Sequence, residues 1–146
     1  MDQVFKPAYC LDDMMKTTLQ AGIAGKRAFR IGRDSTIGFM GEDARVYATP
    51  MLVRDIEVTC RDLLLEHLDP GEDSVGTRVE LDHLAPSLEG AEVTIDVKLA
   101  ELRGRAAVFE VAAFEKAEKI GQGRHSRFIV DVAKTKERLQ KKRAAA

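Results

Sequence analysis

The segment VYATPMLVRDIEVTCRDLLLEHL, residues 46–68, decides the fold of this 146-residue chain. Thr49 followed by Pro50 is typical of a helix start, because a threonine oxygen accepts a hydrogen bond from a free amide of the first turn and proline has no amide to satisfy. The Asp-Pro-Gly sequence at residues 69–71 predicts that the helix ends near Leu68. We therefore expect one helix over residues 50–68 with Thr49 as its N-cap.

Apolar residues cover much more of this helix than the single stripe of a surface helix. They are Met51, Leu52, Val53, Ile56, Val58, Cys60, Leu63, Leu64, Leu65 and Leu68. We expect the helix to be buried on several sides. Glu57 lies on the same line as Val53 and Cys60, where an unpaired carboxylate is costly. Glu57 is therefore a candidate functional residue.

Length and composition limit the class of protein. A chain of 146 residues fits one domain whose core needs no disulfide or metal. Lysine and arginine number 23 against 24 acidic residues, so no overall field favours nucleic acid or an anionic membrane. Cys10 and Cys60 lack metal-ligand spacing and suit a reducing compartment. With no signal peptide or membrane-length apolar run recognised, we expect a cytoplasmic protein without nucleic-acid, membrane or metal partners.

The segments before the helix carry weaker signals. Residues 1–25 are expected to form an N-terminal extension with a short helix that starts at Asp12 or Asp13 and ends at Gly22. Alternation then predicts a strand over residues 26–31.

Residues 36–45 are expected to form an ordered loop that carries two large apolar side chains. Phe39 and Met40 either close the end of the core or line a substrate pocket, since apolar loop residues usually pack against something.

From the helix to about residue 132 the apolar pattern has a period of two, which predicts antiparallel strands. Gly104 indicates a hairpin turn between two of them. The sides predicted to face the core are Val75, Thr77, Val79, Leu81 and His83 in the first strand, and Val93, Ile95, Val97 and Leu99 in the second. His83 is therefore expected on the core side.

A long apolar helix followed by four long strands predicts an α+β hotdog fold, in which a curled antiparallel sheet wraps around the central helix. This domain is expected to span residues 26–135, followed by a charged, solvated tail over residues 136–146. Open sheet edges favour pairing of identical subunits, so we expect a homodimer or a higher homo-oligomer.

Several motifs together resemble the hotdog acyl-CoA thioesterases related to fluoroacetyl-CoA thioesterase. They are Val46-Tyr47-Ala48-Thr49, Glu57 eight residues on, Pro70-Gly71-Glu72, Ser74-Val75-Gly76-Thr77, His83, and Ile120-Gly121-x-Gly123-x-His125-x-Arg127. The resemblance covers about residues 26–135 and implies hydrolysis of a small or medium acyl-CoA to free acid and coenzyme A. Coenzyme A would enter as part of the substrate, without a further cofactor.

The resemblance also implies site residues. Thr49, Glu57 and His83 match the catalytic set, Gly76 matches the glycine whose amide meets the thioester carbonyl, and Arg127 matches the arginine of the last strand.

The lid phenylalanines of fluoroacetyl-specific members fall at Met40 and Asp43 in an ungapped match, with Phe39 adjacent. Strong preference for fluoroacetyl-CoA is therefore not expected.

The residue types suit thioester hydrolysis, which needs a nucleophile or base, a proton carrier and oxyanion donors. Glu57 would attack or activate water, His83 would carry a proton, and Thr49 would donate a hydrogen bond. Thr49 and Glu57 are separated by about 12 Å of helix rise. A bridging substrate, an irregular first turn or a second subunit must therefore bring them together.

Other interpretations stay open at this point. Thr49 alone is compatible with a plain helix cap, His83 with a core histidine, and Glu57 with a structural ion pair to Arg127. A hotdog domain that binds acyl-CoA without cleaving it, or a hotdog hydratase or ammonia-lyase acting on acyl-CoA, would use the same scaffold.

Overall fold

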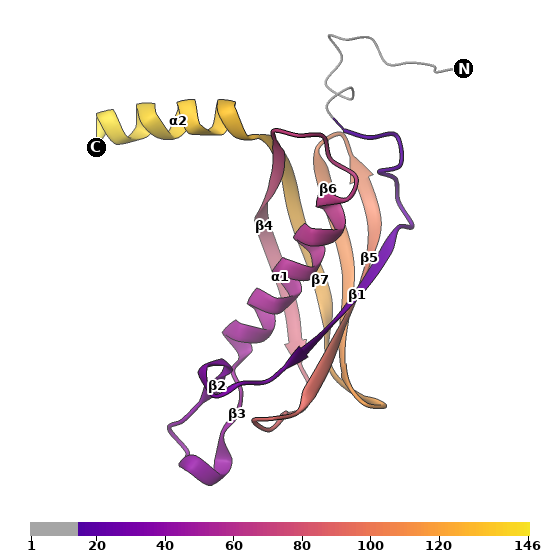
Figure 1. Cartoon of the computed structure of the whole chain (residues 1–146), viewed down its shortest axis with the longest axis vertical. Coiled ribbons are helices and arrows are strands. Elements are labelled where there is room, and N and C mark those ends of the chain that lie inside the picture. The colour runs from indigo at the N-terminus through magenta and orange to yellow at the C-terminus, as the bar shows by residue number, and fades with distance from the viewer. Residues whose placement is uncertain (1–14) are drawn as a thin grey trace.

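A curled sheet of five antiparallel strands holds one long helix, α1, in its hollow (Figure 1). The computed structural model describes residues 15–146. The sheet order is β1-β5-β6-β7-β4. The elements of this body are β1 (Ala24–Arg30), α1 (Thr49–Leu65), β4 (Glu72–His83), β5 (Glu92–Arg103), β6 (Ala106–Glu115) and β7 (Glu118–Asp131). The predicted α+β hotdog architecture is confirmed.

The start of α1 differs from the prediction by one residue. Ala48, in extended conformation at φ −75° and ψ 135°, is the N-cap, and its carbonyl accepts hydrogen bonds from the amides of Met51 and Leu52 at 2.9 and 3.0 Å. Thr49 is already the first helical residue and makes no capping bond. The N-cap prediction for Thr49 is therefore wrong, and its hydroxyl is free for another partner.

The core lies between one broad face of α1 and the inner side of the sheet. Its largest helix residues include Leu52, Ile56 and Leu64, each at most 1% exposed. The four inward residues predicted for β5, Val93, Ile95, Val97 and Leu99, are all buried as expected. Each such side chain contributes about 1.5 to 3 kcal/mol on burial.

The open side of α1 is less covered than the sequence pattern predicted. Val53 and Val58 keep partial exposure to solvent, so in a single chain the helix is buried on one broad face and not on several sides. The helix also ends at Leu65, and a turn continues to Leu68.

A bulge in β4 changes which side chains face the helix. The pairing of β4 with β7 shifts between Gly76 and Arg78, so Thr77 is an extra residue in the strand. Val75, predicted inward, lies on the other side and is 46% exposed. Beyond the bulge Leu81 and His83 face the helix, as predicted.

The segment between β1 and α1 is more ordered than a plain loop. It contains two short 3-10 turns, Arg33–Ser35 and Glu42–Ala44, and a small antiparallel pair formed by β2 (Thr36–Ile37) and β3 (Val46–Tyr47). This excursion lies at the end of the helix where α1 begins (Figure 1).

From Met15 onward, the structure shows no helix in the segment where the N-terminal helix was predicted. Asp12 and Asp13 lie outside the described residues, and from Met15 onward the chain is extended or turning. Met15 instead forms an isolated bridge with Leu68.

The C-terminal residues form a second helix, α2 (Val132–Ala145), which projects away from the body (Figure 1). The Asp131 carboxylate caps it by accepting a hydrogen bond from the Lys134 amide at 2.9 Å. None of its residues is buried. Within residues 15–146, no helix is both long and apolar enough to span a membrane.

Candidate active site

The structure brings two of the predicted catalytic residues into contact. Thr49 in the first turn of α1 and His83 at the end of β4 are joined by a hydrogen bond of 2.8 Å between Thr49 Oγ1 and His83 Nδ1. Either tautomer of His83 satisfies this bond, with the hydroxyl as donor to a bare nitrogen or as acceptor from a protonated one. The contact exists because Thr49 is not used as the helix cap.

Tyr47 packs against this pair. Its ring meets the His83 ring edge-on, with 6.2 Å between centroids and 83° between planes. The Tyr47 hydroxyl donates a hydrogen bond to the Asp55 carboxylate, and both residues are 2% exposed. Burial and then the Asp55 bond raise the pKa of Tyr47 well above its usual 10, so Tyr47 stays a protonated donor.

His83 is neutral at physiological pH. Burial lowers its pKa below the usual 6.5 because the charged imidazolium is poorly solvated there. Its Nε2 atom is buried and has no hydrogen-bond partner among residues 15–146. A neutral imidazole with one uncommitted nitrogen is suited to accept or carry a proton.

An open cavity of about 420 Å³ adjoins Thr49 and His83. Apolar side chains form most of its wall, including Ile37, Val46, Leu84, Ala85 and Pro86. Phe39 also lines it, with 82% of the residue exposed. Met40 is 53% exposed and does not border this cavity, so of the two loop residues only Phe39 reaches it.

Glu57 belongs to a second cluster farther along α1. Its Oε1 atom lies 3.5 Å from Arg127 Nη1, and its side chain is 39% exposed. A Cβ atom added to Gly76 would lie only 2.9 Å from Glu57 Oε1, so the carboxylate sits directly over that glycine. Because α1 is helical from its first turn, an irregular start does not bring Glu57 to Thr49, which is about 12 Å away along the helix.

Arg127 is held from three sides in this second cluster. Its Nε donates to Ser74 Oγ at 2.7 Å, its Nη2 donates to the Ser74 carbonyl at 2.8 Å, and its Nη1 donates to His125 Nε2 at 3.1 Å. Burial lowers the pKa of Arg127 while Glu57 acts in the opposite direction. The guanidinium remains charged, as arginine does in proteins.

The tautomer of His125 follows from its partners. Its Nδ1 lies 2.9 Å from the carbonyl oxygen of Arg78, which only accepts, so Nδ1 carries the hydrogen and Nε2 accepts from Arg127. Burial is the main cause that lowers the pKa of His125.

His125 and Arg127 lie on the buried side of β7, against what strand alternation alone predicts. Because they alternate with the apolar Phe128, the sequence pattern predicts that Phe128 faces the core and that the two polar residues face solvent. The structure shows the reverse: His125 is 1% exposed and Arg127 5%, whereas Phe128 is 43% exposed. Their polar atoms are tolerated inside because Ser74 and the bulged backbone of β4 supply partners.

The sequence comparison places the chain among known enzymes. A family model described as "Fluoroacetyl-CoA-specific thioesterase" matches residues 31–133, most of the chain. The chain belongs to this family. The resemblance proposed from the motifs and the expectation of an acyl-CoA thioesterase are thereby confirmed.

Individual relatives agree with the family assignment. The fluoroacetyl-CoA thioesterase of Streptantibioticus cattleyicolor is 31% identical over 104 residues, which cover 71% of this chain and 75% of the relative. A crystal structure of a phenylalanine-to-alanine mutant of the fluoroacetyl-CoA-specific thioesterase, in complex with fluoroacetate and CoA, has a TM-score of 0.74 and 27% identity, covering 80% of this chain and 99% of its own. A hypothetical protein of Thermus thermophilus, described as a thioesterase superfamily member, has a TM-score of 0.78 and 27% identity over 89% of this chain and 99% of its own.

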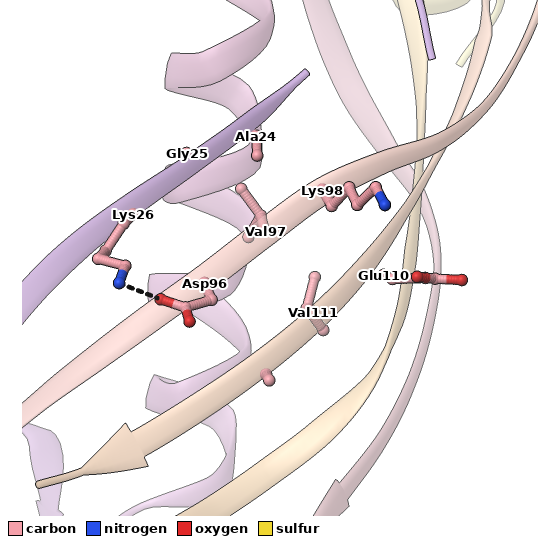
Figure 2. Close-up of a pocket in the computed structure, with 9 residues that line it drawn as sticks. Ala24, Gly25, Lys26, Asp96, Val97, Lys98, Glu110 and Val111 are labelled. Atoms are coloured by element: carbon pink, nitrogen blue, oxygen red, sulfur yellow. Dashed lines mark ion pairs between the residues drawn. The ribbon is translucent and has the colours of Figure 1, made fainter. Parts of the chain in front are cut away.

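In this member of the fluoroacetyl-CoA-specific thioesterase family, a further hollow of about 330 Å³ lies across β1, β5 and β6 (Figure 2). Two lysines and two carboxylates line it, and Lys26 Nζ lies 3.7 Å from Asp96 Oδ1. The charges balance, so this hollow offers no excess field for an anionic ligand. The Thr49 and Glu57 clusters therefore remain the candidate site.

Four residues of the candidate site were not predicted from the sequence as site residues: Tyr47, Asp55, Ser74 and His125. A signal existed for Tyr47 and Asp55, since Asp55 is a charged residue inside the apolar pattern of the helix and needs a buried partner. Ser74 and His125 stand in the motifs quoted from the sequence, but their contacts with Arg127 became visible only with the register of β4 and β7.

Proposed function

We propose that this chain hydrolyses acyl-CoA thioesters with Thr49, His83 and Glu57, in active sites that two copies of the chain complete together. The observation that carries this proposal is the hydrogen bond between Thr49 and His83 at the side of a largely apolar cavity. Family membership supports the reaction class. We also propose a cytoplasmic location, which suits the free thiol of Cys60.

The chemistry assigns one task to each group. With Glu57 as base, water gives it a proton as the water oxygen bonds to the thioester carbon, and cleavage of the C–S bond releases a thiolate that takes up this proton. With Glu57 as nucleophile, its oxygen bonds to the carbon, the C–S bond breaks and the coenzyme A thiolate leaves. Water then attacks the resulting anhydride, which returns the Glu57 carboxylate and the free acid, and the proton released passes to the thiolate. The Thr49 hydroxyl and the Gly76 amide donate hydrogen bonds to the oxyanion, and His83 relays protons. No metal or further cofactor takes part in this route.

A second copy is proposed because Glu57 does not meet Thr49 within one chain. The open side of α1 near Glu57 holds a groove of about 270 Å³ that includes the partly exposed Val53 and Val58. β4 is also one of the two edge strands of the sheet, β1 being the other. Arg54, Arg61 and Arg127 line the same groove, so its surface is mixed and not purely apolar. The two valines and the free strand edge beside them favour contact with another subunit.

Substitution of the carboxylate tests the proposed chemistry. Glu57→Gln should keep the fold and much of the affinity for coenzyme A but lower kcat by about a hundredfold or more, because the lost interaction acts in the transition state. Glu66→Gln, at the exposed residue directly after α1, is the matched control. A folded Glu57→Gln protein with wild-type turnover would leave Glu57 structural and favour an acyl-CoA-binding module that does not cleave its ligand.

Subunit mixing tests whether the site is shared. Thr49→Ala and Glu57→Gln chains are each expected to be nearly inactive alone. If each site takes Thr49 from one copy and Glu57 from the other, random reassortment of dimers restores about a quarter of wild-type activity, since half the dimers then hold one intact site. No restoration after verified exchange would place both residues in a site within one chain.

A further inference from the structure

The cavity beside Thr49 and His83 is much larger than an acetyl group requires. Its volume is about 420 Å³, within the range of pockets that bind drug-sized ligands. A methylene takes about as much space as a water molecule in the liquid, about 30 Å³. A chain of about eight carbons would therefore occupy just over half of the cavity, whereas an acetyl group would leave most of it empty.

The wall of the cavity is fixed by backbone hydrogen bonds. The Tyr47 amide donates to the Ser87 carbonyl at 2.8 Å, and the Leu84 amide donates to the Ile120 carbonyl at 2.7 Å. Val46 also pairs with Leu88 as an isolated bridge. The loop after β4 and strand β3 are thus held together, so the cavity exists before a ligand arrives.

The chemistry of the wall selects against charged acyl groups. Among residues 15–146, no lysine, arginine, aspartate or glutamate lines the cavity. The Tyr47 hydroxyl is already bonded to Asp55. A second carboxylate on the acyl group, as in a succinyl thioester, would lose its hydration without gaining a partner.

Exposed apolar side chains gather at the same place. Phe39 and Leu84 line the cavity and are 82% and 52% exposed, and Leu88, next to Val46, is 62% exposed. Single exposed apolar residues are ordinary, but a group of them at the rim of one cavity indicates a binding surface. An acyl chain seated here would cover them and leave its thioester at Thr49 and His83.

We propose that the acyl group of the substrate is an uncharged apolar chain of at least about four carbons, with room for about eight, that lies in this cavity. The inference rests on the proposed thioester hydrolysis. It adds that the protein discriminates by chain length and by the absence of charge.

A panel of thioesters tests the inference through thiol release. The substrates are acetyl-, fluoroacetyl-, butyryl-, hexanoyl-, octanoyl- and succinyl-CoA. We expect kcat/KM to rise about three- to fourfold for each added methylene until the cavity is filled, which corresponds to the usual 0.8 kcal/mol per methylene. Succinyl-CoA should be cleaved at least about a hundredfold more slowly than hexanoyl-CoA. Highest activity with acetyl- or fluoroacetyl-CoA, or equal activity with succinyl-CoA, would overturn the inference.

A variant in the wall separates the cavity from other causes of chain-length preference. Leu84→Ser should reduce the ratio of hexanoyl to acetyl cleavage by about tenfold, because it places a hydroxyl where the chain packs. Leu139→Ser on α2 is the matched control, since Leu139 is also 52% exposed but does not line the cavity. An unchanged ratio in folded Leu84→Ser protein would contradict the assignment of the cavity.

The experiments distinguish failure of the proposed thioester hydrolysis from failure of the proposed acyl-chain cavity. If no thioester in the panel is cleaved, the proposed hydrolysis is wrong. The cavity is then tested by calorimetric binding of the same acyl-CoA series, in which affinity should still increase from acetyl to hexanoyl. Affinity that does not depend on chain length would overturn the inference about the cavity as well.

Discussion

Replacement of Thr49 by alanine separates a catalytic role from a structural one. The substitution removes the hydroxyl that is bonded to His83 Nδ1 at 2.8 Å and leaves the backbone of α1 unchanged. Since Ala48 and not Thr49 is the N-cap, no capping bond is lost. The expected effect on folding is therefore small, in contrast to the effect on turnover.

The structure sets the size of both effects. A neutral hydrogen bond contributes about 0.5 to 1.5 kcal/mol, and water can replace it here because Thr49 is exposed. Alanine is also the better helix former by a few tenths of a kcal/mol. The free energy of unfolding should therefore fall by less than about 1 kcal/mol. Loss of an oxyanion donor instead costs about 2.7 to 4 kcal/mol in the transition state, or a hundred- to a thousandfold in kcat.

Two measurements on the same preparation check this. Urea denaturation gives the free energy of unfolding, and thiol release from the best substrate of the panel gives kcat. Thr49→Ser keeps the hydroxyl and should remain within about tenfold of the wild-type rate. Wild-type turnover in Thr49→Ala, or a loss of activity matched by a large loss of stability, would refute a role for the hydroxyl in the reaction.

Three further predictions follow from other parts of the molecule. Burial lowers the pKa of both His83 and His125 below 6.5, so the folded protein binds fewer protons than the unfolded chain. The free energy of unfolding that depends on these two neutral histidines should be fully present above about pH 6.5 and be lost as the pH falls through their lowered pKa values. A urea midpoint that is equal at pH 7.5 and pH 5 would contradict this. Gly123→Ala should cost about 3 kcal/mol or more, because its Cβ would lie 1.9 Å from the Glu80 carbonyl oxygen, whereas Gly32→Ala meets nothing within 4 Å and serves as control. Light scattering at micromolar concentration should give at least a dimer, and a stable monomer would remove the shared site.

Much of the fold could be predicted from the sequence because its signals are local. The inward residues of β5 follow a strict period of two with β-branched and leucine side chains. The central helix carries apolar residues at helical spacing and a proline near its start. Each pattern lies within one segment, so it can be interpreted without knowing which other segments pack against it.

What could not be predicted depends on pairing between segments. Gly76 hints at an irregularity in β4 but does not fix its position or effect. The bulge at Thr77 moves Val75 to the outer side and keeps His83 on the inner one. The inward position of Arg127 depends on Ser74, which lies 53 residues earlier in the chain.

The candidate site shows the same limit. The rise per residue of a helix correctly predicted that Glu57 and Thr49 do not meet within one chain. The contact between Thr49 and His83 joins elements 34 residues apart and required the tertiary structure.

Cys60, the one cysteine among residues 15–146, has a practical consequence for biochemical work on this protein. Cys60 is fully buried against the sheet, and burial raises the pKa of its thiol to about 12. Thiolate is the reactive form, so a disulfide-exchange dye would not label Cys60 in the native protein. When the protein unfolds and exposes Cys60 to water, the same dye would label its thiol. In a Cys10→Ser variant, the dye would therefore have two uses. With substrate present it would measure the release of coenzyme A, and without substrate it would measure the unfolding that exposes Cys60.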